Sequence, residues 1–239
     1  YEQALPHYTR ALALMEKARG PEHPDVAISL NNLGNVSRDM GRHEQALRYH
    51  TRALAVREKA LGPEHAKVAM SIHNLGTVLY AQGRYELALR RFEHARAVWE
   101  KALEPGHPHL ASVYQYLGRV YVKLQEWDKA EHLLEQARAV AEKSLRGARS
   151  SELAGALLGL GELRLAQGRP AAAVPLLEQA LTLAMAGKAE VRFLLAQSLW
   201  GSGGDKRRAV ALATEARAEW QRLGHPTLAQ ASQWLTRAL

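Results

Sequence analysis

The chain has 239 residues, and its 47% hydrophobic and 23% charged content is that of an ordinary soluble protein. It contains no cysteine, which excludes disulfides and thiolate zinc sites and is compatible with a reducing, cytoplasmic location. The net charge is +8, but the basic residues are spread along the chain, which favours an acidic partner or a plain solvated surface over nucleic acid.

The first two 42-residue segments repeat each other. Residues 1–42 and 43–84 carry the same amino acid at about 25 positions, including Glu-Gln-Ala-Leu at 2–5 and 44–47. A fixed period between ~20 and ~50 residues is typical of an array of stacked structural units. Such arrays act mostly through long concave surfaces that bind other proteins.

Each unit is predicted to consist of a first helix, a short turn containing Gly, a second helix and a longer turn. In the first helices, apolar residues recur at spacings of three and four, as at Leu30, Leu33 and Val36, which is the pattern of an amphipathic α-helix. The second helices carry alanine at matching positions, beginning with Ala46 and Ala53. No segment alternates with period two, so no strand is expected.

Glycine stands on the apolar stripe of the first helices, at Gly34, Gly76, Gly118 and Gly161. Gly inside a helix costs about 1 kcal/mol relative to Ala, so its recurrence indicates a packing requirement. We expect these glycines to let each first helix approach its second helix closely.

The two ends of the chain depart from the repeat. The chain opens on a second helix, so we expect residues upstream of Tyr1 to belong to the same array. Towards the other end, Gly147–Ser150 replaces the Gly-Pro-Glu-His turn, and Ala196 stands where Gly is expected. We predict a single array with a second helix at 1–19, units at 24–61, 66–103, 108–145, 150–185 and 188–223 (the last short and degenerate), and a capping helix at 226–239.

These positions together resemble the tetratricopeptide repeat. The Leu-Gly pairs at 33–34, 75–76 and 117–118 fit the family's first helix, and Phe92 and Ala95 fit its second helix. The 42-residue unit, with Gly-Pro-Glu-His-Pro-Asp-Val-Ala before Leu-Asn-Asn-Leu-Gly in the first copy, is similar to the kinesin light chain subtype.

The resemblance implies an all-α fold, a right-handed α-α superhelix of antiparallel helix pairs with a C-terminal capping helix. It also implies a non-catalytic module that binds a peptide or protein segment in its concave groove. A further resemblance, at 189–196, 216–218 and 234–235, is to the ends of repeat regions that follow bacterial Ser/Thr protein kinases. The alternative function is therefore a structural, self-associating regulatory region of a larger bacterial signalling protein.

The sequence contains no motif that would carry catalysis or bind a cofactor. Gly-x-Ser-x-Gly, a Walker loop and His-Glu-x-x-His are all absent, so no enzyme is expected. No apolar run approaches the ~18–20 residues needed to cross a bilayer, so no membrane segment is expected. The histidines of the longer turns fall in different units, too far apart for bonds of about 2 Å to one metal ion. We expect turn and capping roles for these histidines, His23, His65, His107 and His225.

Polar residues occupy the side of the first helices opposite the apolar stripe. In the tetratricopeptide family this side lines the groove, and the resemblance implies that a partner binds there. Asn can hold a peptide backbone through both its N–H and its C=O groups, and Arg or Lys would favour acidic side chains. A plain solvated face is the alternative. The candidate site residues are Asn31, Asn35, Arg38, His73, Thr77, Tyr80, Gln115, Arg119, Lys123 and Glu162.

Overall fold

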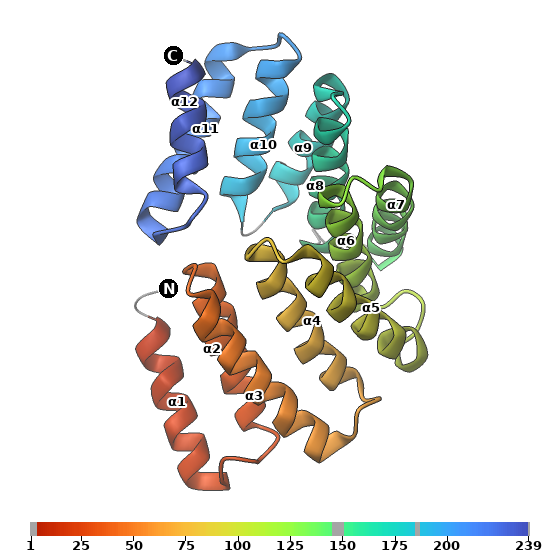
Figure 1. The fold of residues 1–239 in the computed structure, drawn as a ribbon, viewed down its shortest axis with the longest axis vertical. Coiled ribbons are helices and arrows are strands. Elements are labelled where there is room, and N and C mark those ends of the chain that lie inside the picture. The colour runs from red at the N-terminus through yellow and green to blue at the C-terminus, as the bar shows by residue number, and fades with distance from the viewer. Residues whose placement is uncertain (1–3, 145–150, 185–186, 239) are drawn as a thin grey trace. The chain divides into compact units, whose positions relative to one another are not determined.

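The computed structural model describes residues 4–144, 151–184 and 187–238, and every regular element in these ranges is an α-helix (Figure 1). The predicted all-α helical-repeat fold class is thus confirmed. The predicted turn at Gly147–Ser150 lies outside the described residues. The helices are α1 (Ala4–Arg19), α2 (Val26–Asp39), α3 (His43–Leu61), α4 (Ala66–Ala81), α5 (Tyr85–Ala102), α6 (Pro108–Lys123), α7 (Trp127–Ser144), α8 (Ser151–Ala166), α9 (Pro170–Leu183), α10 (Lys188–Gly201), α11 (Lys206–Leu223) and α12 (Leu228–Ala238).

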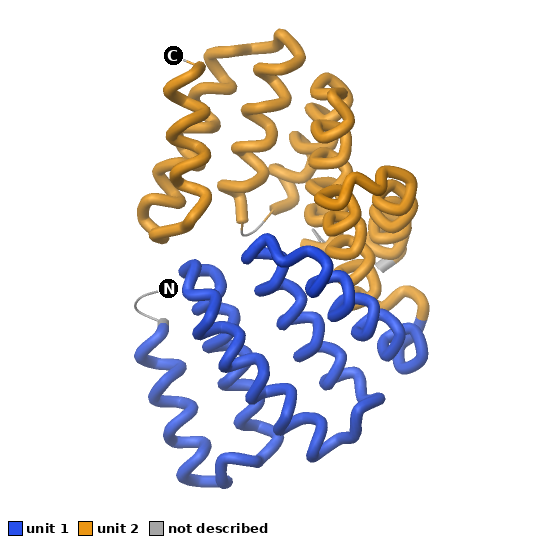
Figure 2. The backbone as a smooth tube through the Cα atoms, viewed as in Figure 1, with its two compact units in different colours: residues 1–104 blue, residues 105–239 orange. Residues whose placement is uncertain are grey.

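Contacts between the helices divide the chain into two compact units, unit 1 (Tyr1–Glu104) and unit 2 (Pro105–Leu239) (Figure 2). In unit 1, α1 packs against α2, α2 pairs with α3, and α4 pairs with α5. In unit 2 the pairs are α6 with α7, α8 with α9 and α10 with α11, and α12 packs against α11. Within each compact unit, the first helices of successive repeats also contact one another. These contacts join α2 with α4, and α8 with both α6 and α10. Polar residues on neighbouring first helices can therefore act together.

The short turns within the pairs require a left-handed backbone. Gly41 and Gly83 have φ of 70° and 74°, a region that glycine adopts without steric cost. The N–H of the following residue bonds back into the helix, as from Arg42 to the carbonyl of Ser37 at 2.8 Å, which closes the helix end. Between α6 and α7, Gln125 takes this place with φ of 61°, so the backbone of the turn is kept where its usual residue is lost.

The histidines of the longer turns bond to the backbone close to the start of the helices that follow them. His65 and His107 are N-caps, and each ring Nδ1 accepts a hydrogen bond from the backbone N–H two residues on, at 3.0 Å and 3.1 Å. His23 and His225 make the same contact at 3.2 Å and 3.3 Å, with N–H groups that lie in the turns before α2 and α12. The four side chains thus take the predicted turn and capping roles.

The recurring glycines sit where a first helix crosses its second helix. A Cβ added to Gly34 would lie 2.5 Å from the ring of His50, and one on Gly76 would lie 2.6 Å from the ring of Phe92. The same distance, 2.6 Å, separates such an atom from Leu134 at Gly118 and from Leu177 at Gly161. The predicted close approach is confirmed, because a real side chain in these places would push the two helices apart.

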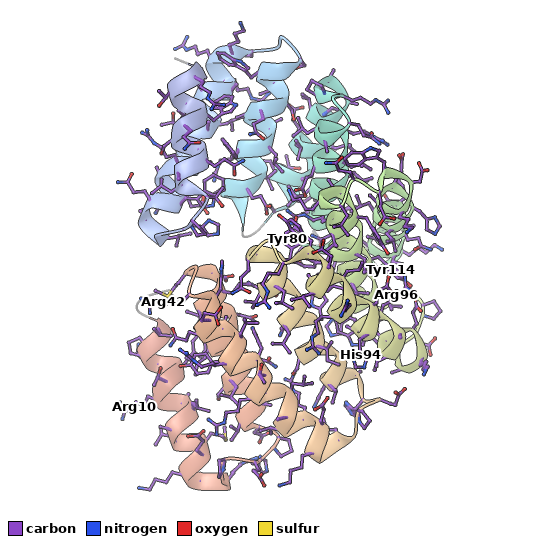
Figure 3. All side chains as sticks on the ribbon, viewed as in Figure 1. Arg10, Arg42, Tyr80, His94, Arg96 and Tyr114 are labelled. Atoms are coloured by element: carbon purple, nitrogen blue, oxygen red, sulfur yellow. The ribbon has the colours of Figure 1, made fainter. Side chains whose placement is uncertain are left out.

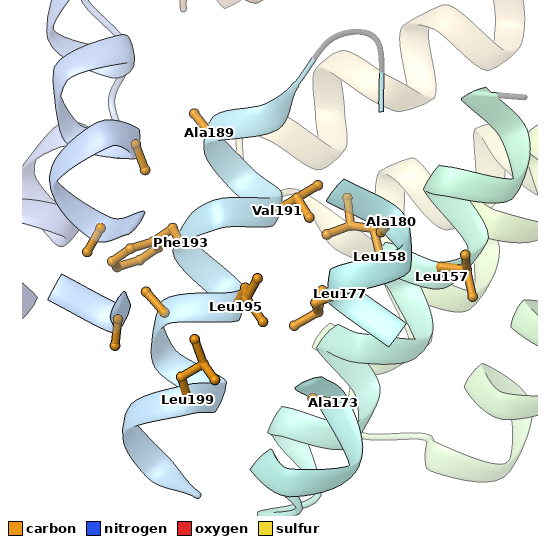
Figure 4. Close-up of a cluster of buried hydrophobic side chains, with 14 of the residues drawn as sticks. Leu157, Leu158, Ala173, Leu177, Ala180, Ala189, Val191, Phe193, Leu195 and Leu199 are labelled. Atoms are coloured by element: carbon orange, nitrogen blue, oxygen red, sulfur yellow. The ribbon is translucent and has the colours of Figure 1, made fainter. Parts of the chain in front are cut away.

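The core of unit 2 continues through its last three helices. Leu177, Leu195 and Leu199 lie in the buried cluster shown in Figure 4. Phe193 of the same cluster meets Trp220 and Trp234 edge-on, with ring centroids 5.5 Å and 6.1 Å apart. Because Trp234 belongs to α12, this last helix covers aromatic surface of α10 and α11, as expected of a cap.

Helix α1 is more exposed than the second helices that follow it. The side chain of Leu14 is 58% exposed, whereas Val56 and Val98 at the equivalent positions are 7% and 3% exposed. Ala11 is exposed too, whereas Ala53 and Ala95 are buried. An apolar face of α1 is thus open to solvent. None of the helices in the described ranges combines the length and the apolar character that a membrane crossing demands.

Candidate functional site

The ten predicted site residues divide between the two units. In unit 1, α2 carries Asn31, Asn35 and Arg38, and α4 carries His73, Thr77 and Tyr80, with Tyr80 in the last turn of its helix (Figure 3). In unit 2, α6 carries Gln115, Arg119 and Lys123, and α8 carries Glu162. We call these polar sides of α2 and α4, and of α6 and α8, the first-helix faces of units 1 and 2.

Burial separates these residues into two classes. Asn35, Arg38 and Tyr80 are half-buried and Lys123 is exposed. Asn35 Oδ1 and the Tyr80 hydroxyl are themselves buried, so the polar groups that a partner could reach directly are those of Arg38 and Lys123. The other six are buried between helices: Asn31, His73, Thr77, Gln115, Arg119 and Glu162. Each first-helix face is therefore a layer of accessible polar groups above a floor of buried ones.

In unit 1 the floor is a hydrogen-bonded network that joins three helices. With the Asn31 amide oriented to satisfy both neighbours, its nitrogen donates to His50 Nδ1 at 3.1 Å and its oxygen accepts from Arg57 at 2.6 Å and 2.7 Å. Arg57, on α3, also donates to Ser71 Oγ at 2.9 Å and to the carbonyl of Lys67 at 3.0 Å, both on α4. The network fixes the Asn31 side chain in place.

This network is cationic and has no carboxylate. Arg57 is only 5% exposed, burial lowers the pKa of its guanidinium, and none of the described acidic residues lies within ion-pair distance of it. Burial, followed by the charges of Arg38, Arg57 and His73, lowers the pKa of His50 to about 3, so its ring is neutral. The face of unit 1 therefore presents positive potential from a floor without a counter-ion.

The accessible part of this face is held by polar contacts between α2 and α4. Arg38 donates from Nε and Nη2 to Asp39 at 2.9 Å and 2.8 Å, and from Nη1 to Thr77 Oγ1 at 3.1 Å. Thr77 in turn donates to the carbonyl of Asn74 at 2.8 Å. Arg38 is thus oriented along the helices rather than free in solvent.

The His73 side chain is buried against aromatic residues and is not accessible to a partner. Its ring centroid lies 5.3 Å from those of both Phe92 and Trp99, which belong to α5. Trp99 donates from Nε1 to the carbonyl of Ala66 at 3.0 Å, so the aromatic group also ties α5 to the start of α4. His73 therefore belongs to the floor of the unit 1 face.

In unit 2 the floor is a chain of ion pairs. Arg119 donates from Nε to Glu162 at 2.8 Å and from Nη2 to Glu190 at 2.5 Å, and Lys123 lies 2.5 Å from Glu162. Burial alone would raise the pKa of Glu162, but Arg119 and Lys123 hold it below its ordinary value. Gln115 fills the space at Gly155, against which its amide packs. The cations predicted to attract acidic residues are thus already paired in this unit.

Two residues of the site, Arg57 and Glu190, were not predicted from the sequence. Arg57 could have been found, because the equivalent positions hold Met15, Trp99 and Ala141. A charged residue in such an apolar series indicates a polar contact that the other repeats lack. Glu190 carried no such signal, since its partner Arg119 lies 71 positions away. Among the described residues, no three His, Asp or Glu side chains gather in a way that could hold a metal ion.

Sequence models of the tetratricopeptide repeat match residues 1–59, 25–96, 67–143 and 117–186, and a second model of the same repeat matches 158–223. The chain belongs to the tetratricopeptide repeat family. No curated protein sequence matches it significantly. Proteins of this repeat family are generally non-catalytic scaffolds for interactions with other proteins.

Solved structures share the fold. Repeats assigned to a kinesin light chain of Podosopora anserina superpose with a TM-score of 0.59 at 25% identity, covering 84% of this chain and 97% of that one. A thermophilic TPR protein of Thermus thermophilus gives 0.59 at 22% identity, covering 89% and 98%. A Rap protein solved in complex with Competence and Sporulation Factor gives 0.67 at 16% identity, covering 98% and 68%. The predicted likeness to kinesin light chain repeats is confirmed.

Proposed function

We propose that this chain is a non-catalytic interaction module that binds a peptide or protein segment along its first-helix faces. The observation that carries the proposal is the preorganised polar floor beside the accessible side chains of Arg38 and Lys123. Side chains already fixed by hydrogen bonds lose little freedom when a partner binds, which favours affinity. The Rap protein, which shares the fold, was solved with a bound factor, so the fold is compatible with such a role.

The partner segment is proposed to be acidic where it meets unit 1. Arg57 lies at the floor without a carboxylate, and Arg38 on α2 keeps part of its surface accessible beside its partner Asp39. A carboxylate brought by a partner would gain charge-assisted hydrogen bonds in a partly desolvated place. Because Asn35 Oδ1 is buried, Asn35 would contribute its Nδ2 alone, as a donor to a backbone carbonyl of the bound segment.

The proposal predicts that changes confined to accessible face residues abolish partner binding. We expect Asn35→Ala combined with Lys123→Gln to reduce capture of the native partner at least tenfold, since loss of a peptide contact and loss of a charge each cost about 1–2 kcal/mol or more. Glu162 keeps Arg119 as an ion-pair partner in this variant. The measurement is quantitative affinity capture from the native cell with purified variants.

The matched control is Thr51→Ala combined with Lys143→Gln, the same two kinds of change on exposed positions of α3 and α7. It should capture the partner as well as the unmodified chain does. Equal capture by the face variant and by the control would refute binding along the first-helix faces.

Self-association is the second candidate, carried by the sequence resemblance to a regulatory repeat region of a larger protein. Light scattering on a size-exclusion column decides this. A mass that stays monomeric over a wide concentration range rules the second candidate out.

A further inference from the structure

The carboxylate of Glu190 reaches across the unit 2 face to a helix that is not its neighbour in sequence. It lies in the first turn of α10 and bonds to Arg119 of α6 at 2.5 Å, while α8 contacts both of these helices. The Glu190 side chain is 46% exposed, whereas that of Arg119 is 5% exposed. A partly exposed acid thus accepts a hydrogen bond from Nη2 of a buried guanidinium.

The two carboxylates that Arg119 binds differ in how firmly they are held. Glu162 is buried and accepts from both Arg119 and Lys123, so removing it would take away the buried counter-ion of the buried Arg119. Glu190 has only Arg119 as an ion-pair partner among the described residues and keeps nearly half of its surface in water. It could leave Arg119 and become fully hydrated at small cost.

The acid at this position is specific to α10. The equivalent positions of the earlier first helices hold Ile28, Met70, Ser112 and Gly155. The repeat itself therefore does not require a carboxylate there. An acid in the first turn favours the positive end of the α10 dipole, and its bond to Arg119 gives it a second role that the other first helices lack.

We propose that Arg119 forms a carboxylate-binding subsite of the unit 2 face, and that Glu190 occupies it as an internal substitute until an acidic partner side chain displaces it. The inference rests on the proposed function and adds to it the chemistry of one contact and its regulation. The exchange replaces one carboxylate by another, so the charge of the group formed by Arg119, Lys123, Glu162 and the bound acid stays balanced. Binding at this subsite is then limited by competition with Glu190.

The test uses the full chain and two blocked peptides of equal length, one alternating Glu and Ala and the other alternating Gln and Ala. Glu190→Gln removes the competing charge and keeps the size of the side chain. We expect this variant to bind the Glu peptide about fivefold more tightly than the unmodified chain, the factor that corresponds to one partly exposed ion pair. Neither protein should gain affinity for the Gln peptide. Isothermal titration at low salt gives the affinities.

The matched control is Glu178→Gln on α9. Glu178 is 42% exposed and pairs with Arg208 at 2.7 Å, so this change alters net charge and one arginine pair equally, away from the first-helix faces. Nitrogen NMR of the Arg119 Nη–H groups provides a direct readout, because Nη2 is the atom that donates to Glu190, and their signals should shift on adding the Glu peptide to Glu190→Gln.

Equal affinities of Glu190→Gln and the unmodified chain would overturn the inference, and so would an equal gain in Glu178→Gln or an Arg119 signal that does not move. These outcomes leave the proposed function standing if the Asn35 and Lys123 variant still loses its native partner. Conversely, if the variant changed at Asn35 and Lys123 keeps its native partner, the proposed function is refuted. This holds for any affinity of Glu190→Gln for the Glu peptide.

Discussion

At the scale of single residues, the close crossing of first and second helices depends on the absence of a side chain. A Cβ at Gly76 would lie 2.6 Å from Phe92, and a leucine there would extend further into the ring. We expect Gly76→Leu to destabilise the chain by about 1–3 kcal/mol, because overpacking forces the helices apart, and to lower its melting temperature by several degrees. Thermal unfolding followed by circular dichroism measures the effect.

The matched control for this change is Gly106→Leu, since a Cβ at Gly106 meets no atom within 4 Å. It should melt close to the unmodified chain. If Gly76→Leu were to melt at the same temperature as Gly106→Leu, glycine at the crossing would have no packing role.

His50 gives unit 1 a sensitivity to acid. Burial, then Arg38, Arg57 and His73, lowers the pKa of its ring from 6.5 to about 3, so below pH 6.5 the unfolded chain binds a proton that the folded chain does not. Stability should therefore fall as the pH drops from about 6.5 towards 3, by up to about 1.4 kcal/mol per pH unit from this residue.

His50→Phe should remove most of this acid dependence, because phenylalanine does not bind a proton. The variant is expected to fold, since Phe92 already occupies the equivalent position against Gly76. Denaturant unfolding at a series of pH values gives the slope. His132→Phe, at an exposed histidine of α7, is the control and should leave the slope unchanged. A slope that survives in His50→Phe would show that the acid sensitivity lies elsewhere.

At the scale of elements, ion pairs on the unit 2 face tie α6, α8 and α10 together. Glu162 bonds to Arg119 and Lys123, both on α6, and is itself buried on α8. We expect Glu162→Gln to cost about 3–5 kcal/mol, because it leaves a buried arginine with one partly exposed acid. Denaturant unfolding at neutral pH tests this.

Glu142→Gln removes the exposed pair with Arg138 at 2.8 Å on α7 and serves as the comparison. That pair is expected to contribute less than about 1 kcal/mol. Comparable losses in the two variants would mean that burial of the Glu162 pairs adds nothing to stability.

The helices and their turns could be predicted from the sequence, because both depend on residues close together in the chain. The glycine of the short turn, the histidine cap and the glycine at the crossing each act within one helix pair, and all are repeated. Periodicity also gave the polar side of each first helix. It could not give the burial of Asn31 or Arg119, since this depends on partners from other helices, such as Arg57 and Glu162.

At the scale of the whole molecule, the two units have the same fold and different electrostatics. In unit 1 the buried cation Arg57 has no described counter-ion, whereas in unit 2 Arg119 and Lys123 are balanced by Glu162 and Glu190. The scaffold is set by the residues that repeat. The proposed recognition of a partner depends on residues of the first helices and on Arg57, which change from one unit to the next.

Hydrogen–deuterium exchange can locate the surface that a partner covers on this chain. The chain would be compared with and without the partner captured from its native cell. Binding along the first-helix faces should slow exchange in α2, α4, α6 and α8, with little change in α3, α5, α7 and α9. Protection confined to these second helices, or to the exposed face of α1, would contradict it.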